Sequence, residues 1–194
     1  LLLFPLTSVE FLEEDKRSDA AANDVYDVPT WRIGDEWVYE TKFDVAQLLQ
    51  QANVAASIVA LTGDTTVTVT NILFMTLNGT QTLVYEVTIE GEFTTGSNGA
   101  TLEGQTGRVD IDYDGIDIIR ASDLSVVTSE FNLYVEFFPN LAIACWFTNC
   151  VLGDINFFTT YEPAKEKRDF PIRNGEQWYQ TFYSQTIVTG TSDY

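Results

Sequence analysis

The chain has 194 residues, 45% of them hydrophobic and 13% aromatic, which is enough apolar material for one good hydrophobic core. It carries 10 Lys and Arg against 29 Asp and Glu, a formal net charge of -19, and this acidity argues against nucleic acid as a partner, because phosphate binding needs clustered cations. Histidine is absent, which excludes triads of the Ser-His-Asp and Cys-His types, and no apolar run reaches the roughly 18 residues that a transmembrane helix needs.

The first part of the chain changes character twice. Residues 1–12 are mostly apolar and begin Leu1-Leu-Leu-Phe, so they resemble either the end of a secretion signal or an N-terminal strand. Residues 13–25 are polar and lack aromatic side chains, which predicts a linker. A folded β domain is expected over residues 26–160, opening near Val28-Pro29, where aromatic and β-branched residues begin to alternate with polar ones.

One helix is predicted near residues 45–60. Asp44 is a suitable N-cap, and Gly63 follows as a stop signal. The apolar residues between them approximate one helical face: Val45, Leu48, Leu49, Ala52 and Ala56.

Short strands are predicted over most of the remaining domain. Residues 65–75 are rich in β-forming residues, and Asn78-Gly79 is the dipeptide that a type I′ hairpin turn prefers. Residues 91–107 contain much glycine and threonine and predict a long irregular connection. Further strands are expected over residues 109–114, 116–127 and 130–138. The expected fold is mainly β: a curved, half-barrel-like antiparallel sheet with one helix packed against it.

A short motif occurs twice. Arg32-Ile-Gly-Asp-Glu-Trp37 is repeated as Arg173-Asn-Gly-Glu-Gln-Trp178, and upstream Asp27-Val-Pro29 is matched by Asp169-Phe-Pro171. These matches predict an internal duplication in which residues 161–194 are the truncated start of a second, similar unit. The chain is then expected to be a fragment of a longer repetitive protein.

Three segments carry a family resemblance: Val28-Pro-Thr-Trp-Arg-Ile-Gly-Asp-Glu-Trp-Val-Tyr39, Gly115-Ile-Asp-Ile-Ile-Arg-Ala-Ser-Asp-Leu124 and Asp169-Phe-Pro-Ile-Arg-Asn-Gly-Glu-Gln-Trp178. They resemble a loose group of prokaryotic secreted and lipid-anchored proteins, over residues 26–138 and 162–183. In that group an opening strand with Pro and Gly-x-x-Trp begins a curved sheet similar to the half-barrel of lipoprotein-localisation-factor-type carriers. The resemblance implies that the concave face would hold a lipid or another apolar ligand, with the helix as a lid.

No catalytic residue carries over from that resemblance. The residues expected to line such a face, which would look the same if they simply formed the core, are Leu83, Tyr85, Val87, Phe131, Leu133 and Val135.

Other candidate sites are local. Cys145 and Cys150 predict a short disulfide loop, and therefore an extracellular, cell-surface or periplasmic location, although two buried thiols are the alternative. Asn78-Gly79-Thr80 fits a glycosylation sequon at Asn78. The acidic residues Asp110, Asp112 and Asp114 before Gly115 match the first half of a calcium loop, but Ala121 stands where such a loop needs glutamate. A solvated acidic strand face is the alternative, and no other cofactor is expected.

Three functions compete. The first is a non-catalytic structural, adhesive or binding module of a repetitive surface protein, with other surface proteins as partners. The second is a carrier of a lipid or another apolar ligand. The third is a carbohydrate-binding or carbohydrate-active module, because Trp37, Tyr39, Trp178 and Tyr179 would suit stacking against a glycan. No catalytic motif singles out a reactive residue, so we expect no enzymatic activity.

Overall fold

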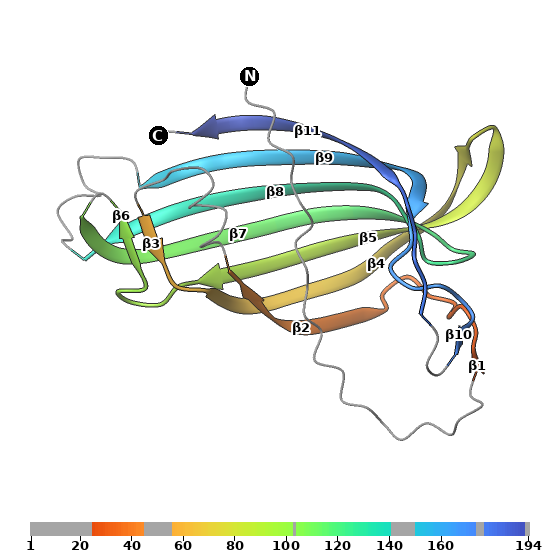
Figure 1. The fold of residues 1–194 in the computed structure, drawn as a ribbon, viewed down its shortest axis with the longest axis horizontal. Helices are drawn as coiled ribbons and strands as arrows, with labels where there is room; N and C mark the ends of the chain where they lie inside the picture. Colours follow the sequence, from red (N-terminus) through yellow and green to blue (C-terminus); the bar gives the residue numbers. More distant parts are fainter. Residues whose placement is uncertain (1–24, 45–55, 103, 141–149, 174–176, 193–194) are drawn as a thin grey trace.

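The computed structural model describes residues 25–44, 56–102, 104–140, 150–173 and 177–192, and most of these are β-strand (Figure 1). Nine strands form one large sheet and two form a separate small ribbon. The described residues contain no helix, and so none that is long and apolar enough to cross a membrane. The expectation of a mainly antiparallel β fold is therefore confirmed.

The strands follow one another along the sheet in nearly the order of the chain. Across the large sheet the order is β11-β9-β8-β7-β5-β4-β2, β6 pairs with β7 and with β3, and every pairing is antiparallel. The bounds are β1 (Val25–Tyr26), β2 (Glu36–Phe43), β3 (Ala56–Ile58), β4 (Leu61–Leu77), β5 (Thr80–Thr94), β6 (Ala100–Leu102), β7 (Gln105–Arg120), β8 (Val126–Pro139), β9 (Val151–Lys165), β10 (Ile172–Arg173) and β11 (Tyr183–Ser192).

The predicted hairpin and the predicted helix have opposite outcomes. Asn78 and Gly79 have φ values of 49° and 80° and join β4 to β5, as a type I′ turn requires. The helix is wrong where the structure describes it, because residues 56–58 form β3 and β4 begins at Leu61. Strand pairing explains the difference: β3 hydrogen-bonds to β6, and Ile58 packs against the core. The rest of the expected helix, residues 45–55, lies outside the described residues.

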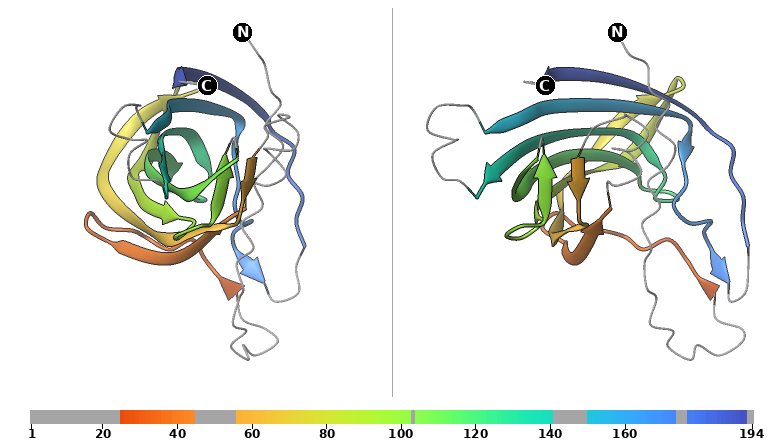
Figure 2. Two further views of the ribbon diagram at one scale, coloured as in Figure 1. Left: turned by 90° about the vertical axis from the view of Figure 1, so that its left-hand side faces the viewer. Right: turned by 60° about the vertical axis from the view of Figure 1, so that its left-hand side comes forward.

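The large sheet is strongly curved and does not close on itself (Figure 2). Glycines within the strands permit this curvature, because they leave room where neighbouring backbone comes close. A Cβ atom on Gly63 would lie 1.9 Å from the carbonyl oxygen of Glu92 on β5, and one on Gly107 would lie 2.8 Å from the Phe137 ring. Close approach of these strands thus depends on residues without side chains.

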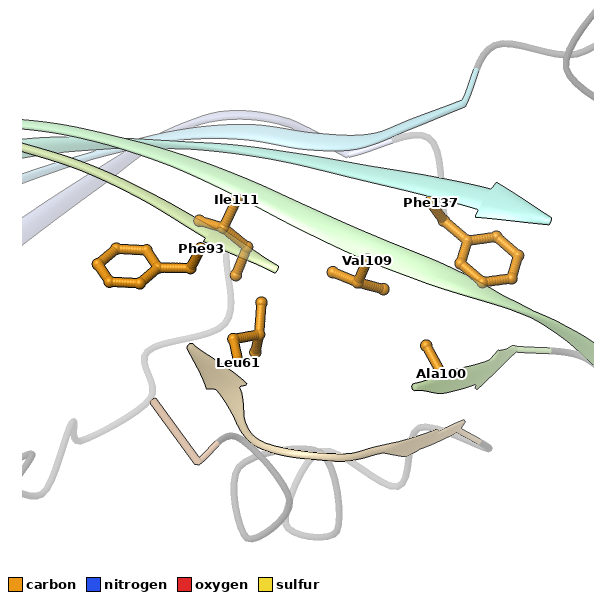
Figure 3. Packing of buried hydrophobic residues seen from close by; sticks show 6 residues of the cluster. All are labelled: Leu61, Phe93, Ala100, Val109, Ile111 and Phe137. Atoms are coloured by element: carbon orange, nitrogen blue, oxygen red, sulfur yellow. The ribbon is translucent and has the colours of Figure 1, made fainter. Parts of the chain in front are cut away.

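Most of the buried apolar side chains lie on one face of the sheet, in two clusters. A curved antiparallel sheet buries mainly the face toward which it curves, so this is the concave face. The first cluster gathers near β3 and β6 and consists of Leu61, Phe93, Ala100, Val109, Ile111 and Phe137 (Figure 3). The second lies further along the same strands and consists of Val69, Tyr85, Val87, Ile119 and Val126.

The first copy of the repeated motif forms the turn that leads into β2. The backbone N–H of Arg32 donates to Oδ2 of Asp35 at 2.8 Å, and Gly34 adopts φ +90°. The Gly34 N–H then donates to the Val69 carbonyl on β4 at 2.8 Å, and the Val69 N–H donates to the Asp35 carbonyl at 2.9 Å. The motif is therefore a turn that docks on β4 just before the β-bulge at Val69.

Tryptophan packing completes this turn. The Trp31 ring lies 5.1 Å from the Trp37 ring and 5.3 Å from the Tyr85 ring, measured between centroids, and all three belong to or pack against the second cluster. In the second copy of the motif, by contrast, Trp178 is 40% exposed and Tyr179 is 93% exposed.

The segments just upstream of the two motif copies meet in the small ribbon. β1 pairs with β10 through Val25↔Arg173 and Tyr26↔Ile172, so the Asp-x-Pro segments that flank these strands lie close together (Figure 1). The expected boundary between residues 160 and 161 falls inside β9, and β11 pairs with β9 along its whole length. The described part of residues 161–194 therefore extends the large sheet, and the duplication stays a prediction. Residues 1–12 and nearly all of the expected linker lie outside the described residues.

The last residues of another resembling segment (residues 115–124) form the turn between β7 and β8. Arg120 Nε donates to Oδ1 and Oδ2 of Asp123 at 2.9 and 3.0 Å, and the Ser125 N–H donates to Asp123 Oδ1 at 3.1 Å. Burial raises the pKa of Asp123, but these hydrogen bonds outweigh that effect and lower it below its ordinary value. This turn therefore has a structural role.

Candidate ligand-binding face

Three aromatic rings form a stack across the concave face. Tyr113 on β7 lies 5.5 Å from Phe131 on β8, and Phe131 lies 4.6 Å from Phe157 on β9, both distances between ring centroids. All three side chains are only partly buried. Cross-strand pairing continues this row to Val188 on β11, which is 54% exposed. The concave face thus presents a band of apolar surface that the described residues do not fully cover.

The six predicted lining residues share this face but differ in burial. Tyr85 and Val87 are 3% and 1% exposed and belong to the second core cluster. Leu83, 37% exposed, lies on the part of β5 nearest the β4–β5 turn. The other three, Phe131, Leu133 and Val135, are partly buried on β8, directly opposite the concave-face residues Gly115, Tyr113 and Ile111. The lining role of the six residues stays a prediction, and the members of the set that remain at least partly exposed are Leu83 on β5 and the three residues of β8.

A buried acid adjoins the aromatic row. Asp117 on β7 is 5% exposed and accepts hydrogen bonds from Ser129 Oγ at 2.5 Å and from Lys167 Nζ at 3.4 Å. Asp117 pairs with Ser129 across the strands, one step along from the Gly115–Phe131 pair. Sequence reasoning missed this group, although a signal was present: Asp117 interrupts the apolar alternation that runs from Val109 to Ile119.

Two lysines, Lys165 and Lys167, lie near Asp117 and Ser129, and these four residues are called the polar cluster. Lys165 is partly buried, and its ammonium lies over the Tyr161 ring at 5.6 Å and the Phe182 ring at 5.8 Å. Burial lowers the pKa of Lys165 and the charge of Lys167 lowers it further, whereas Asp117 opposes both effects. Gln180 holds the backbone of this segment, because its Nε2 donates to the Ala164 carbonyl at 2.8 Å and its Oε1 accepts from the Glu166 N–H at 2.7 Å.

The polar cluster also affects two tyrosines. Burial raises the pKa of Tyr113, and the charges of Asp117 and Tyr161 add to the increase. Burial raises the pKa of Tyr161 as well, again with a contribution from Asp117. Because the unfolded chain loses these protons near pH 10.0 while the folded chain retains them, their contribution to stability is complete below that pH and is lost as the pH rises through the higher folded values.

Alkaline pH is therefore expected to unfold the protein progressively above about pH 10.

Asp117→Asn is expected to lower the pKa of Tyr113 and Tyr161 while leaving both above the ordinary value, because burial is the larger cause. Ultraviolet titration of tyrosinate measures this, and the difference between the parent chain and Tyr113→Phe isolates Tyr113. An unchanged titration in Asp117→Asn would contradict the effect assigned to the charge of Asp117.

The predicted calcium residues lie on the opposite, convex face of β7. Asp110 is held by Arg108 Nε at 2.9 Å and by Thr94 Oγ1 at 2.7 Å. In an extended strand alternate side chains lie about 7 Å apart, so Asp110, Asp112 and Asp114 do not converge on one ion. No group of three His, Cys, Asp or Glu side chains in the described ranges is arranged to hold a metal. The geometry gives the calcium hypothesis no support.

Acidic residues instead form a row across the convex face. Directly paired positions run from β2 to β9 through Glu40, Asp64, Glu92, Asp112, Tyr134 and Asp154. Desolvation and the charges of Glu136, Asp154 and Asp112 raise the pKa of Tyr134 within this row. Negative charge is thus concentrated on the convex face, away from the lysines of the polar cluster.

The remaining predicted sites are local. Asn78 is exposed in the β4–β5 turn, and its glycosylation stays a prediction. Cys145 lies outside the described residues, so its pairing with Cys150 also stays a prediction.

A shallow depression of about 260 Å³ is lined by Gly104, Gln105, Thr106, Pro139 and Asn140. It lies at the opposite end of β7 from Asp117 and includes none of the predicted lining residues.

Comparison of the chain with protein-family models, with curated proteins and with solved structures gave no match. The resemblance to secreted and lipid-anchored proteins therefore stays a prediction from the motifs. What the chain does has to be argued from its own residues.

Proposed function

We propose that this chain is a non-catalytic, extracytoplasmic binding module that takes an elongated apolar ligand on the concave face of its half-barrel-like sheet. The observation that carries the proposal is the stack of Tyr113, Phe131 and Phe157, which stays partly exposed between two buried clusters. Covering such surface is favourable by about 25 cal/mol per Å² of apolar area removed from water. A ligand lying along this band would gain that energy without requiring an enclosed cavity.

The competing functions have different support. Trp37 packs against Trp31 and is partly buried, so one of the four aromatic residues proposed to stack on a glycan is already engaged. A structural or adhesive module of a repetitive surface protein depends on the predicted duplication and makes no use of the exposed aromatic stack. The extracytoplasmic location depends on the predicted cysteine pair.

Neighbouring phenylalanines on opposite faces of β9 provide the test. Phe157 belongs to the concave stack, whereas Phe158 points to the convex face. We expect the full chain to bind the neutral fluorescent probe N-phenyl-1-naphthylamine saturably. Phe157→Ala should weaken binding about fivefold or more, since the lost aromatic contact contributes about 1 kcal/mol in addition to the lost apolar area. Phe158→Ala is the matched control and should bind as the parent chain does.

Thermal unfolding should be followed for both variants, so that binding is compared between folded proteins. Absence of saturable binding, or equal weakening by the two substitutions in folded protein, would contradict the proposal.

A further inference from the structure

We propose that the apolar ligand ends in a single carboxylate, which Lys165 and Lys167 bind where the polar cluster adjoins the aromatic row. This inference rests on the proposed function and specifies the chemistry of its ligand. The polar cluster is defined as Asp117, Ser129, Lys165 and Lys167.

The distribution of charge supports an anionic end group. The chain has only 10 Lys and Arg, yet three of them fall within residues 165–168. The acidic row lies on the convex face, so the two lysines of the polar cluster stand apart from that row, and Glu166 is the acid that lies between them in the chain. A site for an anion is unusual in so acidic a protein, and the fold places it beside the apolar band.

Lys165 has unused hydrogen-bonding capacity. Its ammonium is partly buried and lies over two rings, and no ion pair joins it to a carboxylate among the described residues. An ammonium has three donors, and withdrawing them from water without an acceptor is costly. The two hydrogen bonds of Gln180 to residues 164 and 166 fix the backbone on either side of Lys165. A carboxylate would supply the missing acceptor.

The net charge of the cluster favours a single negative charge on the ligand. Lys167 contacts Asp117 at 3.4 Å, and its side chain is still 58% exposed, so it retains donors for another anion. Two lysines and one aspartate leave one positive charge, which a carboxylate neutralises. Because the Asp117–Ser129 pair is the next concave-face step after the Gly115–Phe131 pair, the apolar chain of such a ligand would continue directly over Phe131 and Phe157.

Displacement of the neutral probe tests this assignment. At neutral pH, dodecanoate is expected to displace N-phenyl-1-naphthylamine at about one tenth of the concentration that dodecanol requires, since one charged contact accounts for roughly a factor of ten. Lys165→Gln should remove this preference, measured as the ratio of the two displacing concentrations within that variant. Lys42→Gln removes the same charge from the convex face of β2 and should keep the preference.

The outcomes separate the two proposals. Equal displacement by dodecanoate and dodecanol, or a preference that survives in Lys165→Gln, would overturn the carboxylate site while leaving the apolar face intact. Stronger displacement by dodecyl phosphate than by dodecanoate would assign the site to a doubly charged head group instead, and would also overturn it. Failure of the probe to bind would overturn the proposed function and this inference together.

Discussion

Gly63→Ala is expected to destabilise the protein by about 3 kcal/mol or more, because the added methyl group meets backbone rather than a movable side chain. The new Cβ would lie 1.9 Å from the Glu92 carbonyl oxygen and 2.9 Å from the carbonyl carbon. Relief requires β4 and β5 to separate where the sheet curves, next to Phe93 of the first cluster. Urea unfolding followed by circular dichroism measures the loss of free energy.

Gly79→Ala is the matched control for that substitution. Gly79 has φ +80° in the β4–β5 turn, and a Cβ there would meet no atom within 4 Å. Its replacement costs only the strain of a left-handed backbone, about 1–2 kcal/mol. If the two variants unfolded at the same urea concentration, close approach of β4 to β5 would not be what Gly63 provides.

Regular alternation made much of the fold predictable. Val109, Ile111 and Ile119 on β7 alternate with polar or more exposed residues, and the buried face follows this period of two. The Asn78-Gly79 turn fixed the register of β4 against β5 in the same local way.

The wrong predictions of secondary structure concern segments whose conformation depends on pairing with strands that are distant in the chain. The apolar spacing near Ala56 fits a helical period, but β3 forms because β6 offers it a partner. β6 itself lies in the glycine-rich segment that predicted an irregular connection. Propensity is a weak guide at such positions, since strand pairing overrides it.

The apolar and polar parts of the candidate site differ in the same way in how far the sequence could predict them. Its apolar half could be predicted, because Phe131, Leu133 and Val135 repeat every second residue on one strand. Its polar half could not, because Asp117 and Lys167 are 50 positions apart and meet only in the folded chain. The Asp110, Asp112 and Asp114 pattern suggested calcium for the opposite reason: spacing along the chain resembled a binding loop, while the strand holds the carboxylates apart.

The two copies of the Gly-x-x-Trp motif are expected to respond differently to the same substitution. Trp37→Ala should destabilise the protein by about 3 kcal/mol, because it removes a partly buried ring that packs against Trp31 and the second cluster. Trp178→Ala should cost no more than about 0.5 kcal/mol, since surface substitutions away from the core seldom cost more. Urea unfolding of both variants, followed by circular dichroism, gives the comparison.

The comparison tests whether the motif or its surroundings supply the stability. Trp37 owes its packing to the docking of Gly34 and Asp35 on Val69 of β4, which places the ring beside Trp31. Trp178 occupies the equivalent position in the second copy of the motif, but its side chain is 40% exposed. Equal losses of stability would mean that Trp178 is packed as tightly as Trp37, and would contradict the exposure that separates the two copies. Unequal losses would locate the stabilising effect in the contact with β4.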